Sequence, residues 1–123
     1  MNKFVLVTGG AGYIGSHTVI ALQQQGYTPV IADDFRNANQ IVLEGLRSIL
    51  GNEPLLHRID ICDDQALTRL FDQYQFEGVI HFAAYKAVGE SVEKPLDYYQ
   101  NNLVGLINVL RHLSTHHVKN FVF

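Results

Sequence analysis

The chain has 123 residues, of which 47% are apolar and 17% charged, a composition typical of one globular domain. Its formal net charge is −3, with no block of like charges, so neither a nucleic-acid partner nor an anionic membrane partner is predicted. The single cysteine, Cys62, excludes an internal disulfide and is expected to be inert in a reducing cytoplasm. The longest apolar runs have the length of strands, and no signal peptide is recognisable.

Apolar runs of strand length alternate with helical periodicity along the chain, which predicts βαβ units and a parallel sheet covered on both faces. We expect strands over residues 3–8, 28–32, 55–59, 78–82 and 118–123. The expected helices span residues 12–25, 40–50, a segment capped by Asp63, and 95–116, with an irregular stretch over 83–94. Right-handed crossovers then give an α/β, doubly wound sheet in the order 3-2-1-4-5.

The first strand ends in a glycine-rich turn, and a helical pattern begins at Tyr13. Gly10, Gly12 and Gly15 satisfy the G-x-G-x-x-G motif of dinucleotide sites, and Gly9 gives the alternative spacing G-x-x-G-x-x-G. One glycine allows a tight turn, the next lets the backbone approach a pyrophosphate, and the last lets the helix lie close to the strand. The unpaired N–H groups of that helix end would face the phosphates.

Acidic residues follow the second and third predicted strands. Asp33 ends the second strand, where a carboxylate accepts hydrogen bonds from the adenosine ribose and repels the extra phosphate of NADP, which favours NAD. Asp34 could take this role instead, and Arg36 could accommodate a phosphate; a pair of solvated loop carboxylates is the alternative. Asp60 ends the third strand, where it could contact the adenine edge or cap a turn.

The fourth predicted strand closes with His81-Phe-Ala-Ala84, whose small residues would permit close approach of a flat ligand or simply pack. Lys86 follows, and it could face a phosphate or be an ordinary solvated lysine. His112, His116 and His117 lie near one helix end, but no fourth ligand accompanies them, so we expect no metal site.

The helix predicted over residues 95–116 carries more apolar surface than a sheet-covering helix requires. One predicted stripe consists of Leu96, Tyr99, Leu103, Leu106, Leu110 and Leu113, and it is widened by Val104, Ile107 and Val109. The surplus predicts a second packing partner, either a later helix or another subunit. The chain also stops inside the fifth strand, whose apolar edge would be exposed, so we interpret it as the first part of a longer protein.

Four stretches of this sequence, residues 7–18, 60–61, 79–95 and 98–102, resemble the N-terminal part of the UDP-glucose 4-epimerase family, extended short-chain dehydrogenases/reductases. The segment Lys86-Ala-Val-Gly-Glu-Ser91 with Lys94-Pro95 is the most specific part of the resemblance. It implies a truncated Rossmann-like domain over residues 1–123 that binds NAD. In the complete enzyme, UDP-galactose and UDP-glucose would be the substrates and the helix over residues 95–116 would form a dimer interface.

The resemblance also implies contacts between individual residues and the cofactor. Tyr13 and Ile14 would follow the pyrophosphate turn, the loop through Asn37 and Ala38 would lie near the nucleotide, and Asn101 would lie toward the nicotinamide. The family often has Asn at position 34 and Ser at position 38. The implied cofactor-binding residues are Gly9, Gly10, Gly12, Tyr13, Ile14, Gly15, Asp33, Asp34, Asn37, Ala38, Asp60, Ile61, Phe82, Ala83, Ala84, Lys86 and Asn101.

No tyrosine in the chain is followed by a lysine at the Tyr-x-x-x-Lys spacing that the family uses as its acid–base pair. The resemblance therefore implies no catalytic residue here, and we expect the chain alone to be inactive. Two alternatives stay open at this point. One is a non-catalytic NAD-binding module or truncated-gene remnant; the other is part of an NAD-dependent sugar-nucleotide dehydratase or decarboxylase, which the segment 86–91 disfavours.

Overall fold

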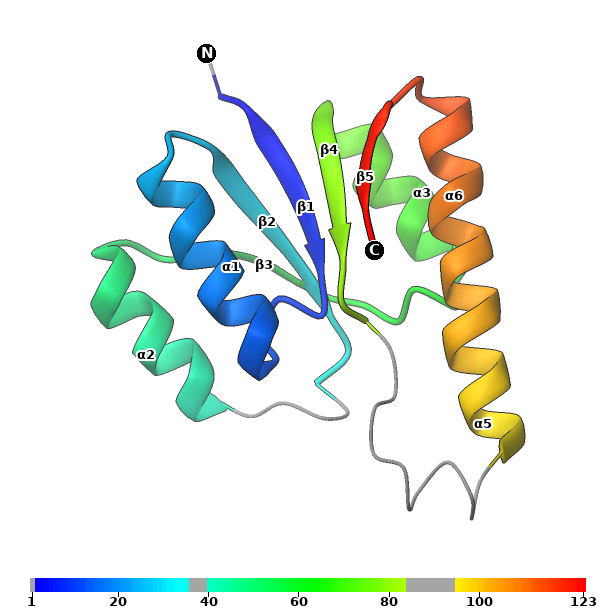
Figure 1. Cartoon of the computed structure of the whole chain (residues 1–123), viewed down its shortest axis with the longest axis horizontal. Coiled ribbons are helices and arrows are strands. Elements are labelled where there is room, and N and C mark those ends of the chain that lie inside the picture. The colour runs from blue at the N-terminus through cyan, green and yellow to red at the C-terminus, as the bar shows by residue number, and fades with distance from the viewer. Residues whose placement is uncertain (1, 36–39, 84–94) are drawn as a thin grey trace.

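The computed structural model describes residues 2–35, 40–83 and 95–123, with the backbone alone for 98–101. Five parallel strands form one sheet in the order β3-β2-β1-β4-β5, as predicted (Figure 1). The strands are β1 (Phe4–Thr8), β2 (Thr28–Asp33), β3 (Leu55–Arg58), β4 (Phe76–His81) and β5 (Asn120–Val122). Each strand lies within two residues of its predicted bounds. The edge strand β5 is short, and its last residue, Val122, and the following Phe123 are exposed.

Helices cover both faces of the sheet (Figure 1). On one face lie α1 (Tyr13–Gln24) and α2 (Gln40–Leu50), and on the other lie α3 (Asp64–Gln73) and α6 (Gly105–Thr115). Asp63 caps α3 as predicted, since its carboxylate accepts hydrogen bonds from the N–H groups of residues 65 and 66. The helix ends at Gln73, and Tyr74 is its C-cap residue. No described helix is long and apolar enough to cross a membrane.

The core divides into two layers because side chains alternate between the faces of each strand. Leu6 and Val30 point toward α3 and α6, where they join a buried cluster that includes Leu67 and Val109. Val7 and Ile31, one position along each strand, join the cluster under α1 and α2. Strands that are apolar on both faces are typical of a parallel sheet covered by helices.

The prediction of one uninterrupted α-helix over residues 95–116 is wrong. The segment consists of α5 (Pro95–Tyr99), a π-helical turn η1 (Gln100–Val104) and α6. The wide turn leads directly into Gly105, where a Cβ would lie 2.6 Å from Ile61 Cδ1. The helix thus approaches the loop after β3 closely at a residue without a side chain. A single wide turn leaves no mark in a pattern that is read with the ordinary helical period.

The predicted apolar residues are divided between the core and the solvent. The residues of α6 that face the core are Gly105, Asn108, Val109, His112 and Leu113. Leu103 and Leu110 of the predicted stripe are instead 52% and 43% exposed. The surplus apolar surface is nonetheless present, and we call it the exposed apolar face. It comprises Leu96, Leu103, Val104, Ile107 and Leu110.

Candidate functional site

The glycine turn between β1 and α1 lies where three strands come together. Gly9 has a φ of +71°, which favours glycine, and its N–H donates to the carbonyl of Ala32 at the end of β2. A Cβ on Gly9 would lie 2.8 Å from the carbonyl carbon of Phe82, just after β4. The turn is therefore in direct backbone contact with the strand that flanks it. A larger residue at this position is excluded both by conformation and by space.

The helix α1 starts directly on this turn. A Cβ on Gly15 would overlap the carbonyl oxygen of Gly9 and lie 2.9 Å from Gly10 Cα. Gly12 is the N-cap, has extended backbone and provides no side-chain hydrogen bond to the helix. The first N–H groups of a helix have no intrahelical acceptor, so they remain available at this end together with the positive end of the helix dipole. The observed turn and the start of α1 together have the arrangement of an anion cradle.

Tyr13 and Ile14 flank that cradle with solvent-accessible side chains, which are 80% and 53% exposed. The ring of Tyr13 lies against that of His17, with 4.9 Å between centroids, and His17 Nδ1 is 2.8 Å from the carbonyl oxygen of Tyr13. The ring of Tyr13 is thus positioned by its contact with His17, one turn further along the helix. A role for them in contacting a cofactor stays a prediction.

Asp33 braces the glycine turn from the end of β2. Its Oδ2 accepts a hydrogen bond from the N–H of Ala11 at 3.0 Å, and its Oδ1 accepts one from the N–H of Phe35 at 2.8 Å. Burial raises the pKa of this carboxyl above its usual value, although these two N–H donors oppose the rise. Each carboxylate oxygen retains acceptor capacity, so Asp33 could still bind a ribose hydroxyl. The bracing role was not foreseen from the sequence.

Phe35 adds a constrained residue to this corner of the sheet. Its φ is +63°, which is uncommon for a residue with a bulky side chain. The bond from its N–H to Asp33 and the guanidinium of Arg58, 4.2 Å from its ring centroid, accompany this conformation. Arg58 faces Asp33 in the β2–β3 ladder. The predicted contacts of Arg36, Asn37 and Ala38 lie outside the described residues.

Asp60 and Ile61 have structural partners of their own. Asp60 Oδ1 accepts a hydrogen bond from the N–H of Cys62 at 2.9 Å, which is the turn-capping role considered for it. The side chain of Ile61 is buried, and its carbonyl oxygen accepts a hydrogen bond from Asn108 Nδ2 at 3.0 Å. These contacts fix the loop after β3 against α6. Contact of either residue with adenine remains a prediction.

The end of β4 is attached to the end of β1 through Thr8. The N–H of Phe82 donates to the carbonyl oxygen of Thr8 at 2.9 Å, and the N–H of Ala83 donates to its Oγ1 at 3.3 Å. The same Oγ1 lies 2.7 Å from His81 Nδ1. Sequence reasoning placed Phe82 and Ala83 at this edge but missed Thr8. Ala84 and Lys86 lie outside the described residues, as does the side chain of Asn101.

The histidines of α6 make contacts within the helical layer. His112 Nε2 is 3.0 Å from Asp64 Oδ1, while its buried Nδ1 has no partner among the described residues. His116 Nε2 is 3.6 Å from Asp72 Oδ1. His117 has a positive φ of +57° at the end of the helix. Within the described ranges, no group of three or more His, Cys, Asp or Glu residues could hold a metal ion.

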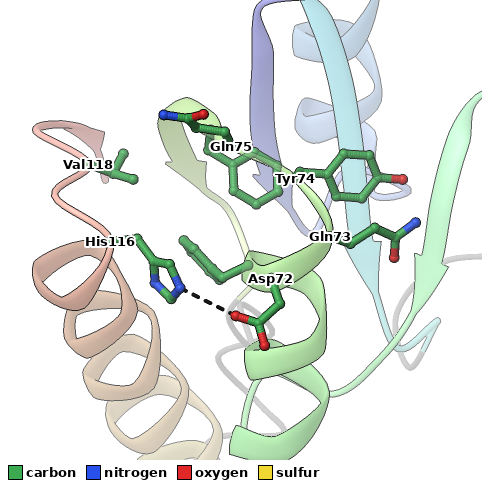
Figure 2. A pocket seen from close by; sticks show the side chains of 8 residues that line it. Asp72, Gln73, Tyr74, Gln75, His116 and Val118 are labelled. Carbon is green, nitrogen blue, oxygen red and sulfur yellow. Dashed lines mark ion pairs between the residues drawn. The ribbon is translucent and has the colours of Figure 1, made fainter.

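A hollow of about 430 Å³ lies beside this layer at the amino ends of β4 and β5 (Figure 2). Figure 2 shows the Asp72–His116 ion pair at its border. Its lining is mostly aromatic and amide, and consists of Phe71, Asp72, Gln73, Tyr74, Gln75, Phe76, His116 and Val118. The glycine turn is at the opposite, carboxyl edge of the sheet, so the two regions are separate sites.

Residues 6–123 match the family model described as GDP-mannose 4,6 dehydratase, and the chain belongs to that family. Within it, the whole chain is 53% identical to the UDP-glucose 4-epimerase of Homo sapiens and 48% identical to UDP-glucose 4-epimerase 2 of Arabidopsis thaliana. It spans 37% and 36% of the lengths of these two relatives. The resemblance to the epimerase family that the sequence motifs predicted is therefore confirmed.

Solved structures give the same result. A UDP-glucose 4-epimerase from Stenotrophomonas maltophila, with bound NAD and formylated UDP-arabinopyranose, has a TM-score of 0.92 at 42% identity and is matched by 99% of this chain. The enzyme from Bifidobacterium longum, in complex with NAD+ and UDP, has a TM-score of 0.91 at 40% identity and is matched by 97% of this chain. In both cases the chain covers 36% of the neighbour.

Proposed function

We propose that this chain forms the NAD-binding part of a UDP-glucose 4-epimerase. The observation that carries the proposal is the glycine turn, because the uncapped start of α1 offers backbone N–H groups where a pyrophosphate would lie. The 53% identity to the human epimerase supports the same assignment. The neighbours with bound NAD support this cofactor, whereas the relatives compared above give no support for the dehydratase or decarboxylase alternative beyond the description of the family model.

The described residues fit the two ends of the adenosine diphosphate moiety. The first N–H groups of α1, at Tyr13 and Ile14, would donate to the pyrophosphate, and Asp33 would accept from the ribose hydroxyls. A carboxylate at this position would repel a 2′-phosphate, which favours NAD over NADP. Bound NAD would supply a reversible hydride acceptor, while these residues bind and orient it.

The substrates proposed for the whole protein are UDP-galactose and UDP-glucose, which it would interconvert through a 4-keto intermediate. Proton transfer by a positioned side chain contributes roughly 10²–10⁴-fold to such reactions. None of the six tyrosines of the 123 residues precedes a lysine at the Tyr-x-x-x-Lys spacing. The acid–base pair is therefore expected elsewhere, and this chain alone should not catalyse epimerisation.

The proposal includes a homodimer that forms through the exposed apolar face, in the cytoplasm. Ile107 and Leu110 on this face are 51% and 43% exposed, although both side chains are large and apolar. Contiguous exposed apolar surface commonly marks a protein–protein contact. The single, non-disulfide cysteine agrees with a reducing compartment.

Titration of the purified chain with NAD and with NADP, at equal ionic strength, tests the cofactor. We expect NAD to bind more tightly, because Asp33 disfavours the extra phosphate. Tighter binding of NADP would overturn this choice and direct attention to Arg36. If neither dinucleotide binds, the chain is not a dinucleotide-binding unit, and the proposal fails.

Incubation of the chain with NAD and UDP-galactose tests the expected lack of activity. No UDP-glucose should form, because the tyrosine–lysine pair is missing from these 123 residues. Turnover that survives rigorous removal of the host epimerase would mean that an effective base lies within the chain. The chain should bind NAD without turnover. If turnover appears when the remainder of an epimerase is supplied, the chain is part of an enzyme; if it does not, the chain is a non-catalytic module.

A further inference from the structure

Arg58 lies beside Asp33 at the carboxyl edge of the sheet. It is the last residue of β3 and the register partner of Asp33, the last residue of β2. Ile31 and Leu56, two positions earlier on the same strands, are also register partners, and both belong to the apolar layer under α1 and α2. Because side chains alternate between the faces of a sheet, Asp33 and Arg58 point to that same face. A basic side chain therefore stands next to the carboxylate proposed to bind the ribose.

The ring of Phe35 positions the guanidinium group of Arg58. The guanidinium carbon lies 4.2 Å from the ring centroid, within the range of a cation–π contact. The ring itself packs against the apolar layer under α1 and α2, and the Phe35 N–H donates to Asp33 Oδ1 at 2.8 Å. A cation–π contact does not require any of the five guanidinium N–H donors. Since Arg58 is exposed, these donors can bind an oxyanion that arrives from solution.

The two charges at this edge have opposite effects on a further negative group. Asp33 is 8% exposed, and burial raises the pKa of its carboxyl, while the positive charge of Arg58 is one of the weaker influences that oppose the rise. The guanidinium is thus close enough to act on this carboxylate. A phosphate on the 2′-oxygen of a ribose bound at Asp33 would be repelled by the carboxylate and attracted by the guanidinium. Arginine is well suited to this contact, because its planar donors match the oxygens of a phosphate.

We propose that Arg58, held against Phe35, is a specificity-determining residue that attracts a 2′-phosphate on the adenosine ribose and reduces the discrimination against NADP imposed by Asp33. NAD remains the preferred dinucleotide, and NADP is a weaker second ligand that the site does not exclude. The inference rests on the proposed function, because it requires a dinucleotide bound at the glycine turn. It concerns the ratio of two affinities, so it can fail while binding of NAD persists.

The experiment compares the unchanged chain with Arg58→Gln and Arg58→Lys in calorimetric titrations with NAD and with NADP at equal ionic strength. Arg58→Gln should weaken NADP binding about tenfold, because a charged hydrogen bond to the 2′-phosphate is lost, and should leave NAD affinity within about threefold. Arg58→Lys keeps the charge without the planar donors, so we expect NADP binding to weaken by only about threefold. Arg69→Gln is the matched control, since it makes the same change of net charge at an exposed residue of α3, on the other face of the sheet. It should leave the ratio of the two affinities unaltered.

An equal loss of NAD and NADP affinity in Arg58→Gln would overturn the proposal, because Arg58 would then act on a part that both dinucleotides share. An unaltered ratio would also overturn it, as would NAD binding to the unchanged chain without measurable binding of NADP. If Arg58→Gln does not fold, Arg58→Lys carries the test, and an unaltered ratio in that variant is the contradicting result. Absence of binding of either dinucleotide to the unchanged chain would refute the proposed function itself, and this inference with it.

Discussion

At the carboxyl edge of the sheet, the start of α1 leaves backbone N–H groups without intrahelical acceptors. At the amino edge, by contrast, several polar side chains around the hollow have side-chain partners. Gly12 provides no cap for α1. Around the hollow, Asp72 pairs with His116, and the Tyr74 hydroxyl lies 2.8 Å from His57 Nε2. The hollow at the amino edge is therefore not the better candidate site. What distinguishes the glycine turn is unused hydrogen-bonding capacity in a backbone that is fixed in place.

The sharpest separation of the two edges should come from Phe71→Ala, at the amino edge. Phe71 is 3% exposed, and its ring contacts Phe76 and the stacked His112. We expect the free energy of unfolding to fall by about 3–5 kcal/mol, as measured in a denaturant titration, because a large cavity is left. The NAD affinity of the folded protein should stay within about threefold of its original value. A large loss of affinity without loss of stability would show that the hollow participates in binding.

For Gly15→Ala at the carboxyl edge, in contrast, we expect a large loss of NAD affinity. Its methyl group would overlap the Gly9 carbonyl oxygen and push α1 off the turn. Overpacking of this kind lowers the free energy of unfolding by about 3 kcal/mol. We also expect the NAD affinity to fall by about a hundredfold in calorimetric titrations. Gly45→Ala in α2 is the matched control, because a Cβ there meets nothing within 4 Å. Equal NAD affinity for both variants would contradict an anion cradle at this turn.

The sequence was sufficient for the sheet and the glycine turn because both depend on local patterns. Apolar runs identify the strands, and the handedness of crossovers leaves one simple strand order. It was not sufficient where a residue's role depends on a distant partner. The second function of Asp33 depends on the N–H of Ala11, and that of Thr8 on the backbone after β4. The π-helical turn before Gly105 likewise depends on the contact with Ile61, which no helical periodicity reveals.

Substitution on the exposed apolar face tests whether this face is an association surface. Ile107→Glu places a charge on this face, at a residue that is 51% exposed. If the face is buried between two copies, the dimer dissociation constant measured by analytical ultracentrifugation should rise by at least about tenfold. Ile49→Glu on α2 is the control, since Ile49 is 64% exposed and outside the face. An equal change in both variants, or a monomer at every concentration, would contradict association through α5–α6.

The smallest expected effect is the pH dependence of stability that arises from the Asp33 carboxyl group at the carboxyl edge. Burial raises the folded-state pKa of Asp33 above its usual value, so the folded protein binds this proton more tightly than the unfolded chain does. The contribution of Asp33 to stability is therefore greatest below the unfolded pKa, and it decreases as pH rises through the raised folded pKa. Above that window the contribution is constant. The sign is opposite to that of a carboxylate stabilised by a salt bridge.

Asp33→Asn isolates this pH dependence, because the amide does not titrate. The substitution also exchanges one acceptor oxygen for a donor opposite the N–H of Ala11 or Phe35, but that cost is independent of pH. Denaturant titrations of both proteins, from pH 3.5 to 7.5, give the difference in unfolding free energy at each pH. We expect the unchanged chain to lose stability relative to Asp33→Asn as pH rises from the unfolded pKa, with a plateau near neutrality. A difference that is flat with pH would show that the two N–H bonds from Ala11 and Phe35 balance the desolvation of the carboxylate, and one that changes in favour of the unchanged chain would show that they outweigh it. The carboxyl edge would then stabilise negative charge even on its own side chain.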